Sequence, residues 1–306
     1  MSGEGPGSSA ASEYRAAGTD LSERRRSGVS TGPVIDLTPT EEQPIQWGDD
    51  GAAMIGAFTT IAVIAADTRI AAAYPGLAAT AAGLATPQIR HVATLGGNLA
   101  QRSRCWYYRN PHIACLKKGG ADCPARTGNH LYHAAFDLGP CIAPHPSSMA
   151  TALLAYEATI ETDRRQGLSI GRLLGDGSDG SSDHALQPDE VIQSATLPLP
   201  LAGERARYKR AIGRSHAEWP LVEVCARAVV ENGSFRFIRL AAGGIAPVPL
   251  RLRASEAMLL GAATTTETMI EAARRATTNA SPLPMTGYKL ALLSGLVQDL
   301  LEQLVA

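Results

Sequence analysis

The sequence predicts an α+β protein with two domains. Its 306 residues, 45% of them apolar, are enough to build two hydrophobic cores. Residues 220–230 and 234–242 alternate well enough between inward and outward positions to predict two antiparallel strands. Helical patterns follow at residues 265–278 and 287–304. A small sheet with helices packed on one face is typical of the α+β class.

The first half of the chain carries shorter elements. Residues 34–37 and 53–57 have the composition of short strands. A helix is expected to begin at Thr59 or Thr60, because a threonine side chain can cap the first turn. The alanine-rich residues 70–85 predict another helix, since alanine is the strongest helix former.

The middle of the chain contains the expected domain boundary. Residues 147–162 predict a helix followed by a strand, and residues 186–197 predict a further strand. We expect residues 14–185 to form the first domain and residues 186–306 the second. Residues 1–13 are rich in glycine and serine and are expected to be disordered.

Composition and charge exclude several classes of function. The formal net charge is −1, which argues against a nucleic-acid partner, since such a partner needs a basic face. No apolar run approaches the roughly 20 residues that span a bilayer. We therefore expect a soluble, cytoplasmic protein without a membrane partner. No acid–base pair, catalytic triad or nucleophile motif stands out, so no catalytic residue is predicted.

Four of the five cysteines lie on a glycine- and proline-rich segment without helical or strand period: Cys105, Cys115, Cys123 and Cys141. Disulfides need an oxidising compartment, and no secretory signal is evident. Zinc sites usually show CxxC-like pairs, and this segment has none. An iron–sulfur cluster needs four thiolates and backbone N–H donors, which the basic, glycine-containing residues 117–120 suit. The spacing favours a metal or cluster over four unrelated thiols, but it is not a signature by itself.

A Gly-Gly pair precedes the cysteines, within the sequence Thr94-Leu95-Gly96-Gly97-Asn98. Glycines let backbone N–H groups approach a pyrophosphate without obstruction by a Cβ atom. The pair is not a Rossmann GxGxxG, and alone it is a weak signal. Its place directly before the cysteine segment makes it a candidate for binding a dinucleotide diphosphate.

A longer pattern runs through residues 86–146. Its matching positions are Ile89-Arg90, Ala93 to Asn98, Gln101, Cys105-Trp106-Tyr107, Arg109, Pro111, Cys115 to Gly120, Cys123, Tyr132-His133-Ala134, Phe136, Gly139 to Cys141 and His145 to Ser147. This segment resembles the FAD-binding medium subunit of the xanthine dehydrogenase/molybdenum hydroxylase family. More narrowly, it resembles the branch with an extra [4Fe-4S] cluster, to which periplasmic aldehyde oxidoreductases and hydroxybenzoyl-CoA reductase belong. Weaker similarity extends from about Ala16 to the C-terminus.

The resemblance implies a fold and a set of site residues. The fold would be an N-terminally shortened FAD-binding domain of the PCMH type, with an iron–sulfur loop at about residues 102–145. A C-terminal domain of the CO dehydrogenase flavoprotein type would follow. The four cysteines named above would hold the cluster. FAD would be bound by Gly18, Thr19, Asp20, Ala57, Thr59, Thr60, Thr94, Gly96, Gly97, Asn98, Gln101, Ser147 and Lys209.

The resemblance also implies a function. The chain would be an FAD and [4Fe-4S] electron-transfer subunit, passing electrons from [2Fe-2S] clusters to FAD and then to an external acceptor. Its partners would be a molybdopterin-binding large subunit and a [2Fe-2S] small subunit, in a heterotrimer or a dimer of heterotrimers. Its location would be periplasmic only if an exported partner carried it.

Three departures from the family pattern suggest an alternative function. Few residues precede the loop at residues 16–21, Ala17 replaces a glycine, and Ser148 replaces an aspartate that helps to hold the flavin. An alanine also disfavours the positive φ that a glycine adopts freely. The alternative is a degenerate structural subunit of the same complex that has lost tight FAD binding.

Overall fold

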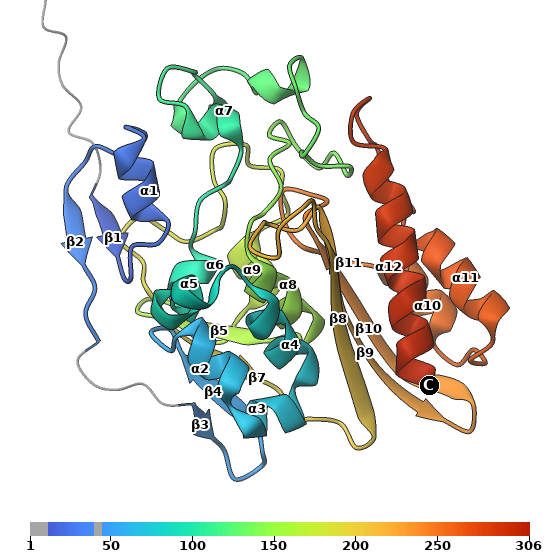
Figure 1. Ribbon diagram of the computed structural model, residues 1–306. Coiled ribbons are helices and arrows are strands. Elements are labelled where there is room, and N and C mark those ends of the chain that lie inside the picture. Colours follow the sequence, from blue (N-terminus) through green and yellow to red (C-terminus); the bar gives the residue numbers. More distant parts are fainter. Residues whose placement is uncertain (1–11, 40–44) are drawn as a thin grey trace, which may run out of the picture.

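The computed structural model describes residues 12–39 and 45–306, which form two domains built on separate sheets (Figure 1). Of the segment expected to be disordered, residues 1–11 lie outside the described ranges. Glu13 begins the first strand, β1 (Glu13–Arg15). This strand pairs in parallel with β2 (Val34–Asp36), and α1 (Leu21–Arg26) lies between them in the chain. The strand expected at residues 34–37 is thus confirmed.

The first domain contains a five-stranded sheet with the order β3-β4-β7-β5-β6. Its strands are β3 (Gln46–Trp47), β4 (Ala53–Gly56), β5 (Thr159–Thr162), β6 (Leu168–Ser169) and β7 (Ile192–Leu197). Strand β7 pairs antiparallel with both β4 and β5. The first sheet therefore includes residues that lie beyond the expected boundary at 185/186, because β7 fills the gap between two earlier strands.

Helices α2 (Ile61–Ala66), α3 (Thr68–Ala73) and α4 (Pro75–Gly83) follow β4. Thr60 caps α2 by accepting a hydrogen bond from the Val63 N–H, as one of the two expected caps. The single helix expected over residues 70–85 is wrong, since α3 ends before Tyr74 and α4 begins at Pro75. Proline lacks an N–H and clashes with the preceding helical turn, but fits the first position of a new helix.

Two short helices lead to the cysteine segment, α5 (Pro87–Val92) and α6 (Leu95–Leu99). The segment itself holds α7 (Trp106–Arg109) and two single turns of 3₁₀ helix. It returns to the first domain at α8 (Ser148–Ala155), and α9 (Ile170–Leu174) follows β6. In Figure 1 the cysteine segment projects from one end of the molecule, above both sheets.

The second domain has an antiparallel sheet with the order β11-β10-β9-β8. Its strands are β8 (Glu204–Ala211), β9 (Val222–Glu231), β10 (Ser234–Gly243) and β11 (Leu250–Arg251), and its helices are α10 (Arg253–Leu259), α11 (Thr266–Arg275) and α12 (Tyr288–Val305). The two strands and two helices predicted for this half are confirmed.

The second sheet is covered on both faces. Helix α12 packs on β8 and β9 from one side, while α4 and α8 of the first domain pack on the same sheet from the other (Figure 1). Eight consecutive residues of β9, Val222–Val229, are accordingly buried. The two domains therefore share a broad interface, and the site described below lies at one end of it. None of the helices in the described ranges is long and apolar enough to cross a membrane.

Candidate functional site

The loop before α1 brings two predicted residues to a cavity of about 450 Å³, which we call the first cavity. Thr19 and Asp20 line it. Gly18 adopts a left-handed φ of 73°, which glycine tolerates without strain. Ala17 is not among the described non-glycine residues with positive φ, so the replacement of a glycine there creates no backbone conflict.

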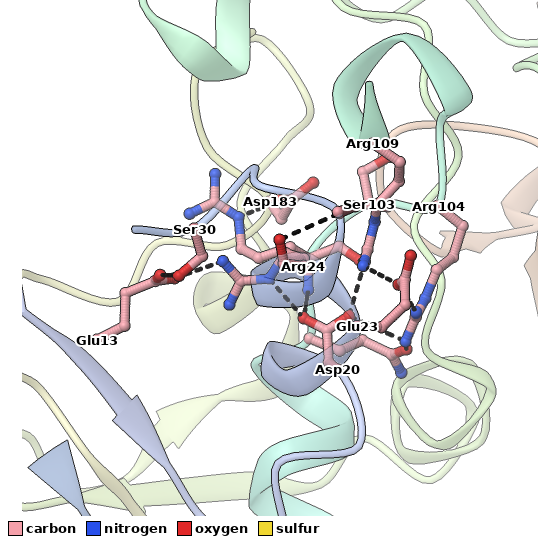
Figure 2. A network of polar contacts seen from close by, with 12 residues as sticks. Glu13, Asp20, Glu23, Arg24, Ser30, Ser103, Arg104, Arg109 and Asp183 are labelled. Carbon is pink, nitrogen blue, oxygen red and sulfur yellow. Dashed lines mark hydrogen bonds and ion pairs between the residues drawn. The ribbon is translucent and has the colours of Figure 1, made fainter. Parts of the chain in front are cut away.

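Asp20 is the centre of a network of charges that is shown in Figure 2. Its carboxylate lies 2.6 Å from an Arg109 guanidinium nitrogen and 3.0 Å from one of Arg104. Burial raises the pKa of Asp20, but the charges of Arg104 and Arg109 outweigh it, and the net pKa lies below the usual value. Glu23 also pairs with both arginines. The network fastens α1 to the segment that leads to the cysteines.

The predicted Gly-Gly turn is a short helix, α6, capped by Thr94, whose hydroxyl accepts a hydrogen bond from the Gly97 N–H. The Gly96 N–H donates to the Ala57 carbonyl at 2.8 Å. A Cβ atom on Gly96 would lie 2.9 Å from the Ala57 Cβ. Glycine is therefore needed at position 96 because α6 approaches the end of β4 closely.

Gly97 lies where two cavities meet. It lines the first cavity together with Asn98 and Gln101. It also lines a second cavity of about 400 Å³, together with Ala57, Thr94 and Gly96. Besides Thr19 and Asp20, six of the residues predicted to bind FAD therefore line at least one of these two cavities on either side of α6.

Other predicted residues support this arrangement from behind. The buried Ser147 caps α8 and donates its hydroxyl hydrogen to the Asn98 Oδ1 at 2.6 Å. Gln101 donates to the Asn98 carbonyl at 2.9 Å. Thr60 forms an isolated bridge with Thr94, and Thr59 is buried beside it. These contacts fix the position of Asn98 at the wall of the first cavity.

Lys209 does not line either cavity. Its Nζ lies 2.8 Å from an Asp299 carboxylate oxygen of α12, on the other face of β8. The next residue, Arg210, lines the first cavity instead. Successive side chains of a strand point to opposite faces, so a lysine and an arginine in sequence cannot both face the cavity.

Several lining residues were not predicted from the sequence. Leu84 and Ala85 line the first cavity from the connection between α4 and α5, and Ile89 lines it from α5 itself. Glu218 and Trp219 line it from the connection between β8 and β9. Period-2 alternation along β8 shows only that Lys209 and Arg210 face opposite sides of the sheet, and the tertiary fold decides which of them faces the cavity. The connection between β8 and β9 carried no comparable signal, because only the tertiary fold brings it to α6.

The four cysteines of the central segment line one common cavity of about 10 Å³. All are free thiols. Gly119 has a left-handed φ of 77°, and a Cβ on Gly120 would lie 2.8 Å from the Cys115 backbone nitrogen. Both glycines are thus required for the loop that places Cys115 at this cavity. Across residues 12–39 and 45–306, no three His, Cys, Asp or Glu side chains converge as ligands of a single metal ion.

Hydrogen bonds to sulfur shape the acidity of these thiols. Burial raises the pKa of Cys105 to about 11, although the Tyr108 backbone N–H opposes it. A hydrogen bond with Cys141 lowers the pKa of Cys123 to about 5, and the Ile142 backbone N–H contributes in the same direction. Their shared proton leaves the pKa of Cys141 raised. Backbone donors therefore already point at two of the sulfur atoms.

Comparison with known proteins identifies the family. Residues 10–200 match the FAD binding domain in molybdopterin dehydrogenase, and residues 207–304 match the CO dehydrogenase flavoprotein C-terminal domain. The chain belongs to this family. It is therefore a flavoprotein-type subunit of an oxidoreductase complex, and the predicted family is confirmed at this level.

Individual relatives agree with this assignment. The aldehyde oxidoreductase FAD-binding subunit PaoB of Escherichia coli (strain K12) is 32% identical over 288 residues, covering 91% of this chain and 89% of PaoB. The xanthine dehydrogenase FAD-binding subunit of Escherichia coli O157:H7 is 24% identical over 232 residues, covering 73% of this chain and 63% of the relative.

Solved structures show the same fold. Carbon monoxide dehydrogenase from Hydrogenophaga pseudoflava superposes with a TM-score of 0.75 at 21% identity, covering 98% of this chain and 90% of the other. Quinoline 2-oxidoreductase from Pseudomonas putida 86 gives a TM-score of 0.73 at 18% identity, covering 96% and 89%. The mixed α/β architecture of an FAD-binding domain followed by a flavoprotein C-terminal domain is thus confirmed.

Proposed function

We propose that this chain is an FAD and [4Fe-4S] electron-transfer subunit of a molybdenum-dependent hydroxylase or dehydrogenase. The observation that carries the proposal is the junction of the first and second cavities at Gly97. Together they offer about 450 Å³ and 400 Å³ along one path, in the size range of cofactor pockets. A dinucleotide has two bulky ends joined by a narrow diphosphate, which matches two cavities joined at a glycine.

The charges and apolar groups along the path suit the parts of FAD. Arg104 and Arg109 line the first cavity and Arg102 lines the second, so cationic groups flank the junction where a diphosphate would lie. Leu84 and Trp219 supply apolar surface for a flavin ring farther along the first cavity. The bound flavin supplies the redox chemistry, while this chain binds and orients it.

The cysteine cavity suits a cubane cluster better than a single ion. In a [4Fe-4S] cluster each thiolate binds a different iron, so the four sulfurs surround a volume and do not converge on one point. Four cysteines that line one cavity, with backbone N–H groups aimed at two of the sulfurs, support a cluster here, and Cys123 and Cys141, which now share a hydrogen bond, would move apart to admit it. Lys117, which also lines the cavity, supplies a positive charge beside an anionic cluster.

The partners follow from the family. PaoB is named as one subunit of an aldehyde oxidoreductase, which implies further subunits in that enzyme. We infer that this chain joins a molybdopterin-binding large subunit and a [2Fe-2S] small subunit, which deliver electrons to its flavin. We place it in the cytoplasm unless an exported partner carries it elsewhere.

One observation favours the alternative of a structural subunit that has lost tight FAD binding. The N–H groups of Gly96 and Gly97 already donate within the protein, to Ala57 and Thr94. Neither is then available to a diphosphate without a rearrangement of α6. Under this alternative the cluster remains and flavin is absent even when the partner subunits are present.

The test is the cofactor content of the full-length chain purified without oxygen. FAD released on denaturation, iron and acid-labile sulfide are counted per chain, and the visible spectrum is recorded. One FAD with four irons and four sulfides per chain is expected. Cys115→Ser should lose the iron and sulfide and keep the flavin. Cys225→Ala is the matched control, since Cys225 is buried in β9 away from the other four.

The possible outcomes separate the two functions. Iron without flavin, in protein co-expressed with its partners, would establish the structural alternative. A folded chain without iron would overturn the cluster. Loss of iron in both the Cys115 and Cys225 variants would show that the loss reflects general instability and not a missing ligand.

A further inference from the structure

The carboxyl group of Glu223 is buried beside the first cavity without a counter-charge. Four acidic residues in the described ranges are buried: Asp183, Glu190, Glu223 and Glu256. Asp183, Glu190 and Glu256 each form a salt bridge with an arginine or a lysine. Within residues 12–39 and 45–306, Glu223 forms no salt bridge, although it is only 2% exposed. An unpaired buried carboxylate is costly, so this carboxyl group is expected to keep its proton.

Three hydroxyl groups surround the Glu223 carboxyl in place of a cation. The Tyr208 hydroxyl lies 2.6 Å from one carboxyl oxygen, and the Thr151 hydroxyl lies 2.9 Å from the other. The Ser148 side chain also hydrogen-bonds with this carboxyl. A hydroxyl group can both donate and accept, so these partners can serve a protonated carboxyl as well as an ionised one.

The packing around Glu223 leaves room for the carboxyl but brings little charge to it. Glu223 pairs with Gly243 of β10, where a Cβ atom would collide with the side chains of Glu223 and Thr151. Burial raises the pKa of Glu223, and the charge that opposes the rise most strongly is that of Arg210 on β8. Burial also raises the pKa of Tyr208 well above its usual value, so this neighbour stays neutral.

Ser148 connects the Glu223 carboxyl to the first cavity, which it lines. It is the first residue of α8 and directly follows the N-cap residue Ser147. Its hydroxyl has a single hydrogen. When a protonated Glu223 donates to Ser148 Oγ, that hydrogen is free to donate into the cavity. When Glu223 is ionised, its carboxylate attracts the hydrogen, and Ser148 offers the cavity only oxygen lone pairs.

We propose that Glu223 is a positioning residue for the flavin of the first cavity, because its proton keeps the Ser148 hydroxyl donating toward that flavin. A flavin that takes up two electrons and one proton gains one negative charge. A hydrogen-bond donor in the cavity wall therefore stabilises the reduced form more than the oxidised form. Burial can keep a carboxyl group neutral for such a role. Glu223 retains its own proton throughout. This inference rests on the proposed FAD-binding function.

The protonation of Glu223 is tested first on the full-length chain without flavin. The infrared spectrum at neutral pH should contain the C=O stretch of a protonated carboxyl, which Glu223→Gln should remove. Glu267→Gln, at an exposed glutamate of α11, is the matched control and should leave this band as it is in the wild type. If Glu223→Gln leaves the band unchanged as well, Glu223 is ionised and the proposal is overturned.

The midpoint potential of the bound flavin, measured from acidic to alkaline pH, tests the effect on the cofactor. Glutamine donates and accepts as a protonated glutamate does, so wild type and Glu223→Gln should agree at acidic pH. At alkaline pH the wild type should fall below the variant, because Glu223 ionises and turns the Ser148 hydroxyl away. The pH dependence of the flavin itself is common to both proteins and cancels in the difference.

Ser148→Ala provides a second variant that leaves Glu223 in place. It removes the donor, so its potential at acidic pH should lie below that of the wild type. Should Glu223→Gln fail to fold, this comparison decides the proposal. A wild-type potential in Ser148→Ala, or equal potentials for wild type and Glu223→Gln at every pH, would overturn the role of Glu223.

The two measurements separate this inference from the function on which it rests. The infrared band requires no flavin, and the FAD content requires no particular state of Glu223. A chain that shows the protonated carboxyl but binds no FAD, even with its partner subunits, would overturn the electron-transfer function and with it this role. A chain that binds FAD with an ionised Glu223 would overturn only the inference.

Discussion

The buried carboxyl group of Glu223 accepts a hydrogen bond from the Tyr208 hydroxyl at 2.6 Å. Thr151 donates to the same carboxyl at 2.9 Å, and the Ser148 side chain also hydrogen-bonds with it. Ser148 lines the first cavity at the position where the family pattern has an aspartate. The first cavity therefore does have a carboxyl group next to Ser148, but this carboxyl belongs to Glu223 of β9, in the second domain.

Replacing Glu223 by glutamine should change how stability depends on pH. Burial raises the pKa of Glu223, although three hydroxyl donors oppose the rise. The folded chain thus keeps this proton to a higher pH than the unfolded chain does. The free energy of unfolding accordingly falls as pH rises from the usual glutamate pKa through the raised one. Glu223→Gln removes that term, and urea unfolding of both proteins at a series of pH values measures it.

The difference between the two unfolding curves is the informative quantity, since other groups titrate in both proteins. Glutamine retains an acceptor oxygen for Tyr208, so the fold should persist. A difference that does not vary with pH would show that Glu223 is ionised in the folded protein at neutral pH. Flavin content measured on the same samples shows whether the charge or only the shape of this residue matters to the first cavity.

Asp183 is expected to hold the cysteine segment in place. Its carboxylate pairs with Lys117 at 2.9 Å and with Arg102 at 2.6 Å, and the side chains of Asp183 and Lys117 are 4% and 5% exposed. Asp183→Asn leaves a buried lysine without its counter-charge, which costs about 3–5 kcal/mol. Asp299→Asn breaks the exposed pair with Lys209 and should cost no more than about 1 kcal/mol. Denaturant unfolding compares the two.

The decrease of the free energy of unfolding at acidic pH tests the same contact of Asp183 with Lys117 and Arg102. Burial alone would raise the pKa of Asp183, but Lys117 and Arg102 hold it far below the usual value. The stability it contributes is therefore full at neutral pH and is lost as pH falls below the usual aspartate pKa. Equal losses in the Asp183 and Asp299 variants would contradict a special role for the buried pair.

Lys289 should make the protein more stable as pH rises. Its Nζ donates to the carbonyls of Tyr132 and Gly244 at 3.0 and 2.7 Å, and the residue is 1% exposed. Burial lowers its pKa from 10.5 to about 7. Between these values the unfolded chain binds a proton that the folded chain has released. The free energy of unfolding should then rise with pH across that window, by up to about 1.4 kcal/mol per pH unit.

Lys289→Met should abolish this rise. It also leaves two carbonyls without a donor, at a cost of about 1–3 kcal/mol each, so the variant is expected to be less stable at every pH. Lys209→Met, at a solvent-exposed ion pair, is the control and should keep the slope of the wild type. If the slopes of wild type and the Lys289 variant coincide, the lysine is not the titrating group.

The local pattern of apolar and polar residues was sufficient to predict the strands of the second domain. Strands β9 and β10 lie within two residues of their predicted ranges, because Asn232 and Gly233 between them adopt the positive φ values of a tight hairpin turn. The break between α3 and α4 could also have been read from Pro75. The β9–β10 turn and the break between α3 and α4 are each determined by a few neighbouring residues, so both can be predicted from the local sequence.

Relations between distant residues could not be predicted in this way. Which of Lys209 and Arg210 faces the first cavity depends on the side of β8 that α12 covers. The placement of β7 between β4 and β5 depends on strands that are far apart in sequence. The family resemblance supplied most of the candidate site, but the junction of the two cavities at Gly97 follows only from the tertiary fold.

The two glycines of α6 should respond differently to substitution by alanine. A Cβ on Gly96 would lie 2.9 Å from the Ala57 Cβ and 3.2 Å from its carbonyl oxygen, so Gly96→Ala must push α6 away from β4. Such overpacking costs about 1–3 kcal/mol. A Cβ on Gly97 would meet only the Thr94 hydroxyl, at 3.0 Å. The gain in helix propensity, about 0.8–1 kcal/mol, should roughly offset that contact.

The Gly97→Ala substitution should weaken FAD binding without lowering stability, whereas Gly96→Ala should affect both. Gly97 lines both the first and the second cavity, so the methyl group of Gly97→Ala would protrude where the two halves of FAD are joined. We expect at least tenfold weaker FAD binding with little change in the unfolding midpoint, whereas Gly96→Ala should lose stability and flavin together. Thermal unfolding of the flavin-free chain and titration with FAD measure the two quantities separately. Normal FAD affinity in the Gly97 variant would mean that the cofactor does not pass through this junction.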